Sequence, residues 1–312
     1  MKFKGLLLKA IGLILISFIL TRVDISKIIS IMLLADFGLL SLAFLLVVGA
    51  FIIKIIRWNS LLTVIGSKFT LQKVSIMALG AYAIGLLTPA KAGDFLRAFW
   101  ASKKSKKPIG QSIATVFLDR IFDLAALVLF GFLGVIAVFN SLSGNPLLLA
   151  IIAGSLLLIG IAILLSMQEF FVKFLVEKFI AVMVPKKFSE KTKGFLSDFY
   201  FAIKKCKKSY AYCALLTFAS WILLLASDFL IARSIGVNVS PSFILIVMPL
   251  VFVVELIPIS VAGIGTREAT VAFLFSIAGF ALEQALAFSF MLFIFNTIFT
   301  LAGLLAFTLQ GE

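Results

Sequence analysis

The sequence predicts an all-α polytopic membrane protein with about six transmembrane helices and two re-entrant helical hairpins related as an inverted repeat. Composition is the first observation behind this prediction. Of the 312 residues, 62% are hydrophobic and 13% are charged, and the mean hydropathy is +1.21. A soluble domain is about a quarter charged, so this chain has too little charge to cover a water-facing surface. The second observation is a pair of apolar segments broken by proline and glycine, and the third is a one-sided distribution of lysine and arginine.

Six uninterrupted apolar stretches are each expected to cross the membrane. The first could be a signal peptide, but we expect it to be retained, because Ser17 to Arg22 offers no small-x-small cleavage site. Lys54 and Arg57 are expected to snorkel from the end of the second stretch. The expected crossings are an N-terminal helix ending at Leu20, and residues 38–53, 109–139, 147–166, 210–232 and 284–309.

The basic residues predict the orientation of the chain. Lysine and arginine number 28 against 14 acidic residues, a formal net charge of +14. Most fall in segments that this topology places on one face, which the positive-inside rule assigns to the cytoplasm. Both termini are then cytoplasmic, in a plasma membrane. Residues 167–209 interleave lysine with apolar residues, which is typical of amphipathic helices on an anionic leaflet. The charge therefore predicts membrane lipids and no nucleic acid as partners.

Two segments, 74–100 and 241–280, are each interrupted in a similar way. The first breaks near Pro89 to Gly93 and the second at Pro258 and residues 263–265. Each break is followed by an arginine, and three crossings lie between the two, so the hairpins enter from opposite faces. Such paired breaks are typical of transporter binding sites, although each could be a kink in an ordinary helix. The chain is expected to form one domain, 1–312, with repeat halves of about 38–139 and 210–309.

Charged residues at membrane depth are the candidate site, because burying them costs a few kcal/mol each. Arginine suits a phosphate group because its planar fork donates two parallel hydrogen bonds, and backbone donors at helix starts would add to it. The predicted substrate-binding residues are Arg97, Arg120, Arg267, Lys91, Gly93, Gly263 and Gly265. The predicted ion-pairing or proton-coupling carboxylates are Asp94, Asp119, Asp123, Glu255 and Glu268. Asp94 could pair with Arg97, three positions on along one helix face, and Glu255 and Glu268 form a group with Arg267. Structural ion pairs that fix helix packing are the alternative interpretation.

Two absences in the sequence narrow the chemistry. The chain has no histidine, which excludes mechanisms that need a histidine base, nucleophile or ligand. Its two cysteines, Cys206 and Cys213, are too few for a zinc site and are interpreted as ordinary thiols. No catalytic residue, metal or cofactor is predicted.

Three motifs resemble those of the lysylphosphatidylglycerol synthase transmembrane family, also called the flippase-like domain family. They are Pro89 to Arg97, Leu118 to Asp123, and Pro258 to Glu268. The family shows Gly-Glu-x-x-Arg, Glu-Arg and Gly-x-Gly-x-Arg-Glu, and here Asp94 and Asp119 replace two of the glutamates. The resemblance implies a lipid flippase or lipid-linked-substrate transporter fold without the soluble synthase domain that some members carry.

The predicted function is therefore a transporter or flippase for an anionic lipid or a polyprenyl-phosphate-linked substrate. The first alternative is an integral-membrane lipid glycosyltransferase or other lipid-modifying enzyme, for which Asp119 and Asp123 are the candidate metal motif. The second alternative is a non-catalytic scaffold that recruits a partner through residues 167–209.

Overall fold

Helices account for all regular structure in the described part of the chain. The computed structural model describes residues 12, 14–87, 93–142, 154, 157, 160, 189–256, 260 and 263–308. Residues 14–20 form a first helical segment. The helices that follow are α2 (Ile25–Leu33), α3 (Phe37–Val64), α4 (Leu71–Leu87), α5 (Asp94–Ser105), α6 (Ile109–Leu142), α9 (Ser189–Cys206), a single 3-10 turn η3 (Lys207–Ser209), α10 (Tyr210–Ser234), α11 (Pro241–Leu256), α12 (Thr266–Ile277) and α13 (Leu282–Thr308). The predicted all-α class is confirmed.

Three described segments are long and apolar enough to cross a membrane, namely Phe37–Val64, Gly194–Ser234 and Leu282–Thr308. Helix α3 begins sharply because the side chain of Asp36 accepts hydrogen bonds from the backbone N–H groups of Gly38 and Leu39, at 2.7 and 3.1 Å. A 28-residue helix is about 42 Å long at 1.5 Å per residue, which exceeds a hydrocarbon core of about 30 Å.

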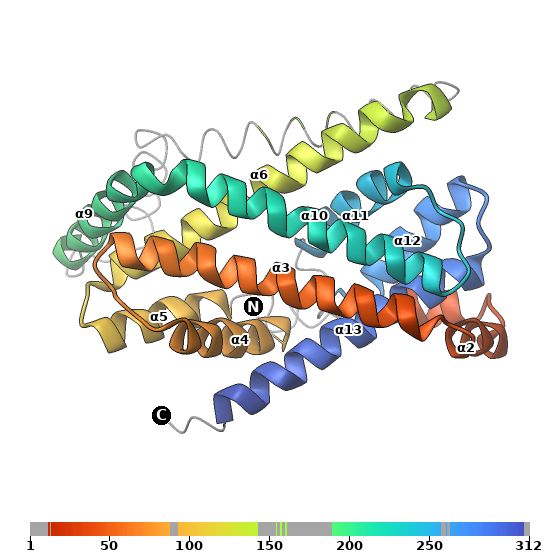
Figure 1. Cartoon of the computed structure of the whole chain (residues 1–312), viewed down its shortest axis with the longest axis horizontal. Helices are drawn as coiled ribbons and strands as arrows, with labels where there is room; N and C mark the ends of the chain where they lie inside the picture. Colours follow the sequence, from red (N-terminus) through yellow and green to blue (C-terminus); the bar gives the residue numbers. More distant parts are fainter. Residues whose placement is uncertain are drawn as a thin grey trace.

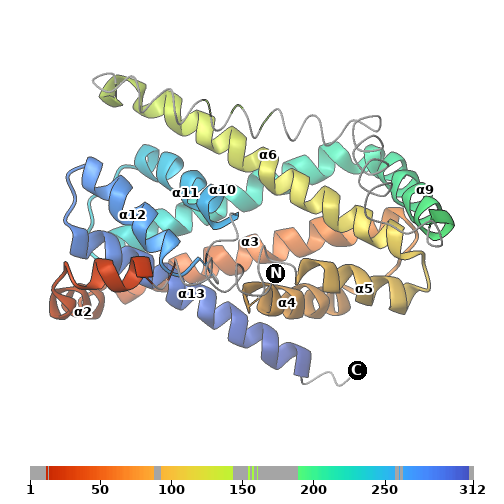
Figure 2. The same ribbon diagram turned by 180° about the vertical axis from the view of Figure 1, so that it is seen from behind.

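The long helices lie along the long axis of the molecule (Figure 1). Helices α3 and α10 pack side by side through the centre and run in opposite directions. Helices α4 and α5 occupy one end, together with α9, and α11 and α12 occupy the other end (Figures 1 and 2). Each of these pairs is a helical hairpin that reaches from its own end toward the middle. The two hairpins are therefore directed toward the middle from opposite ends (Figures 1 and 2).

The two halves of the chain repeat the same packing in opposite orientation. In each half a long helix leads into a hairpin, and a second long helix follows. The first arm of each hairpin packs on the final helix of the other half, α4 on α13 and α11 on α6. The short helices follow the same rule, since α9 packs on α6 and α2 packs on α13. Each hairpin is thus held by both halves of the chain.

Matching turns lead into the two hairpins. Gly66 and Gly236 both adopt a left-handed backbone, with φ of 88° and 75°. After each glycine, the next residue donates a backbone hydrogen bond back into the preceding helix, Ser67 to Leu62 at 2.9 Å and Val237 to Ala232 at 3.0 Å. Arg267 follows Arg97 by the same interval as Gly236 follows Gly66. This constant interval allows individual residues of the two halves to be compared.

Glycines allow the hairpins to approach the long helices closely. A Cβ atom on Gly303 of α13 would lie 2.5 Å from the carbonyl oxygen of Leu79 in α4. A Cβ on Gly134 of α6 would lie 2.5 Å from the carbonyl oxygen of Leu245 in α11. Real side chains do not tolerate such contacts, so glycine is required at both interfaces.

The structure corrects one expectation at the end of an apolar segment. Lys54 and Arg57 were expected to snorkel, but α3 continues past both, and Arg57 is fully buried. Helix α2 lies between the first two apolar stretches, and it begins after Asp24 because the carboxylate of Asp24 accepts from the N–H groups of Ser26 and Lys27.

Several expectations lie outside the described residues. They concern Lys91, the proline-centred parts of both breaks, most of the crossing 147–166 and the first part of the segment 167–209. The boundaries of the repeat halves remain a prediction.

Candidate functional site

A cluster of seven charged residues joins the first hairpin to the long helices beside it. We call it the first ion cluster. Its members come from α3, α5 and α6, and they are Lys54, Arg57, Asp94, Arg97, Asp119, Arg120 and Asp123. The spacing of the three carboxylates follows from the helices, because Asp119 and Asp123 lie one turn apart on α6 and Asp94 begins α5.

Arg57 is the centre of this cluster. Its Nε donates to Asp119 Oδ1 at 2.7 Å, and its Nη1 donates to Asp123 Oδ1 at 3.0 Å and to Thr217 Oγ1 of α10 at 2.7 Å. Its Nη2 donates to the backbone carbonyl of Asp119 at 3.2 Å. The residue is buried, so its charge is held by these contacts and not by water. Arg57 therefore acts as a structural bridge between α3, α6 and α10.

Arg97 holds the hairpin to this bridge. Its Nη2 donates to Asp119 Oδ2 at 2.7 Å, and its Nε lies 3.4 Å from Asp94 Oδ1. Its guanidinium carbon lies 4.7 Å from the ring centre of Trp58, whose own Nε1 donates to Thr115 at 3.1 Å. The expected pairing of Asp94 with Arg97 is confirmed.

Arg120 is the accessible member of the cluster. Its Nη2 lies 2.6 Å from Asp94 Oδ2, and its Nη1 lies 3.9 Å from Asp123 Oδ2. Yet 44% of its side chain is exposed, against 7% for Arg97 and 1% for Arg57. Arg120 lies about 16 Å along α6 from its first residue, and its guanidinium is the most exposed charged group of the cluster.

A second ion cluster lies at the other hairpin and consists of Glu255, Arg267, Glu268 and Ser289. Arg267 Nη1 lies 3.5 Å from Glu255 Oε1, and its Nη2 lies 3.2 Å from Glu268 Oε1. The Ser289 hydroxyl accepts from Arg267 Nε at 3.3 Å and donates to Glu268 Oε1 at 2.9 Å. Arg267 and Glu268 are both buried. The expected grouping of Glu255, Arg267 and Glu268 is confirmed.

The two clusters are built on one plan. Arg97 bonds to Asp119 and Arg267 bonds to Ser289, in each case 22 positions later in the chain. The carboxylate partner is Asp119 in the first half, whereas in the second half it is Glu268, next to the arginine itself. In the second cluster, Arg267 and its partner Glu268 are both buried. The first cluster differs because the guanidinium of Arg120 is exposed.

The glycines lie at the hairpin tips as expected. Gly263 and Gly265 have φ of 76° and 85°, a region that other residues rarely adopt. The N–H of Gly265 donates to Glu268 Oε2 at 2.6 Å, so the start of α12 is capped by its own carboxylate. Gly93 precedes α5, and a Cβ there would overlap the backbone of Gly85 in α4. These positions let each hairpin turn tightly.

The structure brings together part of the predicted substrate-binding set. Arg97 and Arg120 meet at Asp94, whereas the ion pairs of Arg267 belong to the second cluster. Near the first hairpin, the hydroxyl of Tyr82 in α4 donates to Asn296 of α13 at 2.8 Å. The substrate-binding roles themselves remain predictions.

The aspartates of α6 are engaged by cations. Arg57 bonds to Oδ1 of both Asp119 and Asp123, and Lys54 Nζ lies 3.4 Å from Asp123 Oδ1. Within the described ranges, no group of three or more His, Cys, Asp or Glu side chains could hold a metal ion. Cys206 and Cys213 are buried free thiols.

Sequence reasoning missed Arg57 and Ser289 as cluster members. Arg57 had a signal, because the apolar residues Trp58, Leu61 and Leu62 follow it and extend the helix beyond it. The sequence signal for Ser289 was weaker. Ser289 follows Arg267 by 22 residues, and Asp119 follows Arg97 by the same number.

The chain matches a known family over nearly its whole length. The family model described as the lysylphosphatidylglycerol synthase TM region matches residues 6–303. The UPF0104 membrane protein PH1989 of Pyrococcus horikoshii is 27% identical over 309 residues, which cover 92% of this chain and 90% of that protein. Two proteins of Methanocaldococcus jannaschii match shorter parts. MJ1595 is 26% identical over 41% of this chain and 38% of its own length, and MJ1078 is 33% identical over 26% of this chain and 35% of its own length.

Proposed function

Because this chain belongs to the family of the lysylphosphatidylglycerol synthase transmembrane region, we propose that it is a membrane transporter that moves an anionic lipid across the bilayer. The observation that carries the proposal is Arg120, a guanidinium that lies deep in a membrane protein and yet keeps 44% of its side chain exposed. A positive charge at such depth needs an anionic partner or water. Asp94 is one such partner, 2.6 Å from Nη2, and a phosphate of a lipid head group would contact the exposed part of the guanidinium.

The charge balance of the first ion cluster supports an anionic ligand. Among the described residues, four cationic side chains face three carboxylates. The cluster therefore carries one positive charge more than its carboxylates balance, and Arg120, which also pairs with Asp94, is its most exposed cation. Arg97 Nε is a further buried donor with no hydrogen bond among the described residues. A phosphate placed between Arg120 and Arg97 would compete with Asp94 for both guanidinium groups.

The paired hairpins support movement of a ligand, as opposed to simple binding. Broken helices from opposite ends, arranged as an inverted repeat, let each half open in turn around a central site. The first cluster ties one hairpin to α3 and α6, and the second ties the other hairpin to α13 through Ser289. In this proposal, each cluster holds its own hairpin closed while the other hairpin opens during transport.

The lysine-rich end of the molecule supports a cytoplasmic orientation. Lys103 and Lys104 end α5, and Lys204, Lys205 and Lys207 follow on α9 and η3, all at one end of the long axis (Figure 1). By the positive-inside rule this end faces the cytoplasm of the cell membrane, where these lysines contact anionic lipids. Both termini then lie on the cytoplasmic side.

A lipid-translocation measurement tests this function. The purified protein is reconstituted in phosphatidylcholine vesicles with a trace of head-group-labelled phosphatidylglycerol, and dithionite quenching reports the label that reaches the outer leaflet. Replacement of Arg120 by Gln removes a charge-assisted contact of about 1.5–3 kcal/mol, so the rate should fall roughly ten- to a hundredfold.

Arg233→Gln is the matched control, because Arg233 is exposed at the other end of α10 and bonds only to Asn238 among the described residues. This variant should move the lipid at the wild-type rate. Wild-type translocation by a folded Arg120→Gln protein, or equal movement of labelled phosphatidylcholine, would refute the proposal.

A further inference from the structure

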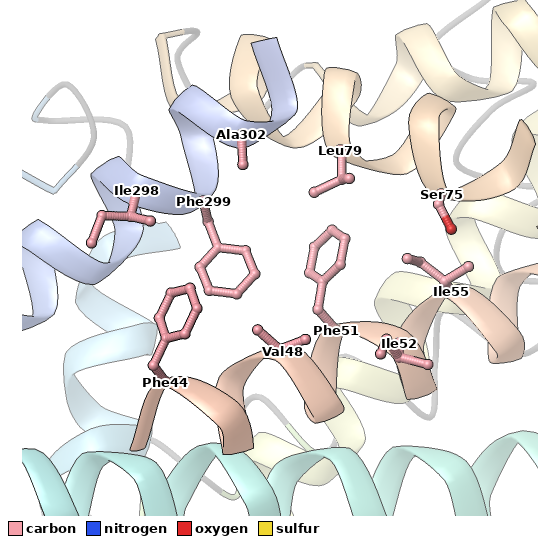
Figure 3. Close-up of a pocket in the computed structure, with 10 residues that line it drawn as sticks. All are labelled: Phe44, Val48, Phe51, Ile52, Ile55, Ser75, Leu79, Ile298, Phe299 and Ala302. Atoms are coloured by element: carbon pink, nitrogen blue, oxygen red, sulfur yellow. The ribbon is translucent and has the colours of Figure 1, made fainter. Parts of the chain in front are cut away.

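An apolar groove lies between α3, α4 and α13, beside the first hairpin (Figure 3). Its volume is about 280 Å³. Its walls are made largely of aromatic and aliphatic side chains, including Phe44, Phe51, Leu79, Ile298, Phe299 and Ala302. The hydroxyl of Ser75, which also lines it, already donates to the carbonyl of Leu71 at 2.8 Å. The groove therefore offers hydrocarbon contact and no free polar donor along its described wall.

The repeat relates this groove to the region between α10, α11 and α6. Trp221 and Phe252 follow Phe51 and Tyr82 by the same interval that relates the two arginines, and both pairs make edge contacts, at 5.5 and 5.9 Å. There, Phe130 of α6 stacks on Trp221 at 6.0 Å, and both residues are buried. An aromatic side chain thus packs against the equivalent of Phe51, whereas the described residues around Phe51 leave a groove between α3, α4 and α13.

A polar side-chain pair lies next to the groove. The ring of Phe51 contacts Tyr82, whose hydroxyl donates to Asn296 of α13. The positions that the repeat interval relates to Tyr82 and Asn296 are Phe252 of α11 and Ala126 of α6, which have no polar side-chain group. The hydroxyl–amide pair therefore accompanies the open groove and is absent from the equivalent positions. It lies where an apolar chain would meet a polar head group.

We propose that this groove binds one hydrocarbon chain of the anionic lipid, with the Tyr82–Asn296 pair marking the boundary between the chain and the head group. The inference rests on the proposed function, because the head group is placed at Arg120. The groove explains how a lipid could be held in register while its head group reaches the first ion cluster. It also distinguishes the two halves of a repeat that is otherwise similar.

Photo-crosslinking tests the groove directly. The probe is phosphatidylglycerol with a diazirine on one acyl chain, in phosphatidylcholine vesicles that contain the reconstituted protein, and mass spectrometry locates the adducts. The expected adducts lie on Phe51, Leu79 and Phe299. Ala302→Trp fills the groove from its rim, and adduct yield at these residues should fall about tenfold, the effect of losing contact with about two methylene groups.

Ala214→Trp is the matched control, since it makes the same exchange at an exposed site on α10 and should leave the yield unchanged. If Ala302→Trp fails to fold, Val48→Trp fills the groove from the opposite wall. Adducts spread evenly over exposed residues such as Leu215 and Ile136, with no effect of either filling variant, would overturn the groove and leave the head-group function standing. Equal groove labelling by a phosphatidylcholine probe would support the groove and count against anionic selection at Arg120.

Discussion

Arg57 Nε donates a 2.7 Å hydrogen bond to Asp119 Oδ1 in the interior of the protein, and this bond joins the first long helix of the chain to α6. Asp119 in turn accepts from Arg97 at 2.7 Å through its other oxygen. One carboxylate thus links α3, the first hairpin and α6. The position of the hairpin, and of the exposed Arg120 beside it, depends on this link.

Removing Arg57 should strongly destabilise the protein. Arg57→Gln removes the buried guanidinium that bonds to Asp119, Asp123 and Thr217, and removing one partner of a buried ion pair typically costs about 3–5 kcal/mol. The free energy of unfolding in mixed micelles measures the loss. Lys54→Gln is the control, because Lys54 is partly exposed and its contact with Asp123 is longer, 3.4 Å, so the loss should stay below about 1 kcal/mol. Equal losses for the two variants would contradict the central role of Arg57.

The close glycine contacts give a second prediction. Gly134→Ala and Gly303→Ala each place a methyl group against a backbone carbonyl of a hairpin helix, so each should destabilise the protein by about 1–3 kcal/mol. Thermal unfolding in detergent measures the effect. Gly194→Ala is the matched control, because a Cβ there meets nothing within 4 Å, and alanine favours a helix by about 0.5–1 kcal/mol. A stabilised Gly134→Ala or Gly303→Ala protein would show that the helices are not in close contact.

Ser289 gives a third prediction. Its buried hydroxyl both accepts from Arg267 and donates to Glu268. Ser289→Ala leaves both partners with an unmade bond, and the cost should be about 1–3 kcal/mol in the free energy of unfolding. Ser276→Ala removes an exposed hydroxyl that donates only to the local carbonyl of Phe273 among the described residues, and it should have little effect. If the two variants are equally stable, the second ion cluster does not depend on Ser289.

Much of the architecture was predictable because membrane helices show strong sequence signals. The hydrophobic stretch 210–232 predicted α10 to within two residues at its end, and the breaks beside Pro89 and Pro258 predicted both hairpins. Asp94 and Arg97, three positions apart, predicted their ion pair. These features are local, and each depends on residues close together in the chain.

The missed features depend on contacts between distant residues. The partners of Arg57 lie on α6 and α10, so a sequence window around Arg57 shows only a basic residue near the end of an apolar run. The open groove is likewise set by whether aromatic residues of a remote helix fill a space, as Phe130 does beside Trp221. Helix α2 is a different case, because its capping residue, Asp24, is adjacent to the helix in the sequence and is therefore a local signal.

Lipid retention by the purified protein tests the central claim most directly. The protein is extracted in mild detergent, offered equimolar phosphatidylglycerol and phosphatidylcholine, and examined by native mass spectrometry. We predict that the wild type and Arg233→Gln retain phosphatidylglycerol preferentially and that Arg120→Gln loses this preference while it remains folded. Equal retention of the two lipids by the wild type, or an undiminished preference in Arg120→Gln, would contradict an anionic head-group site at Arg120.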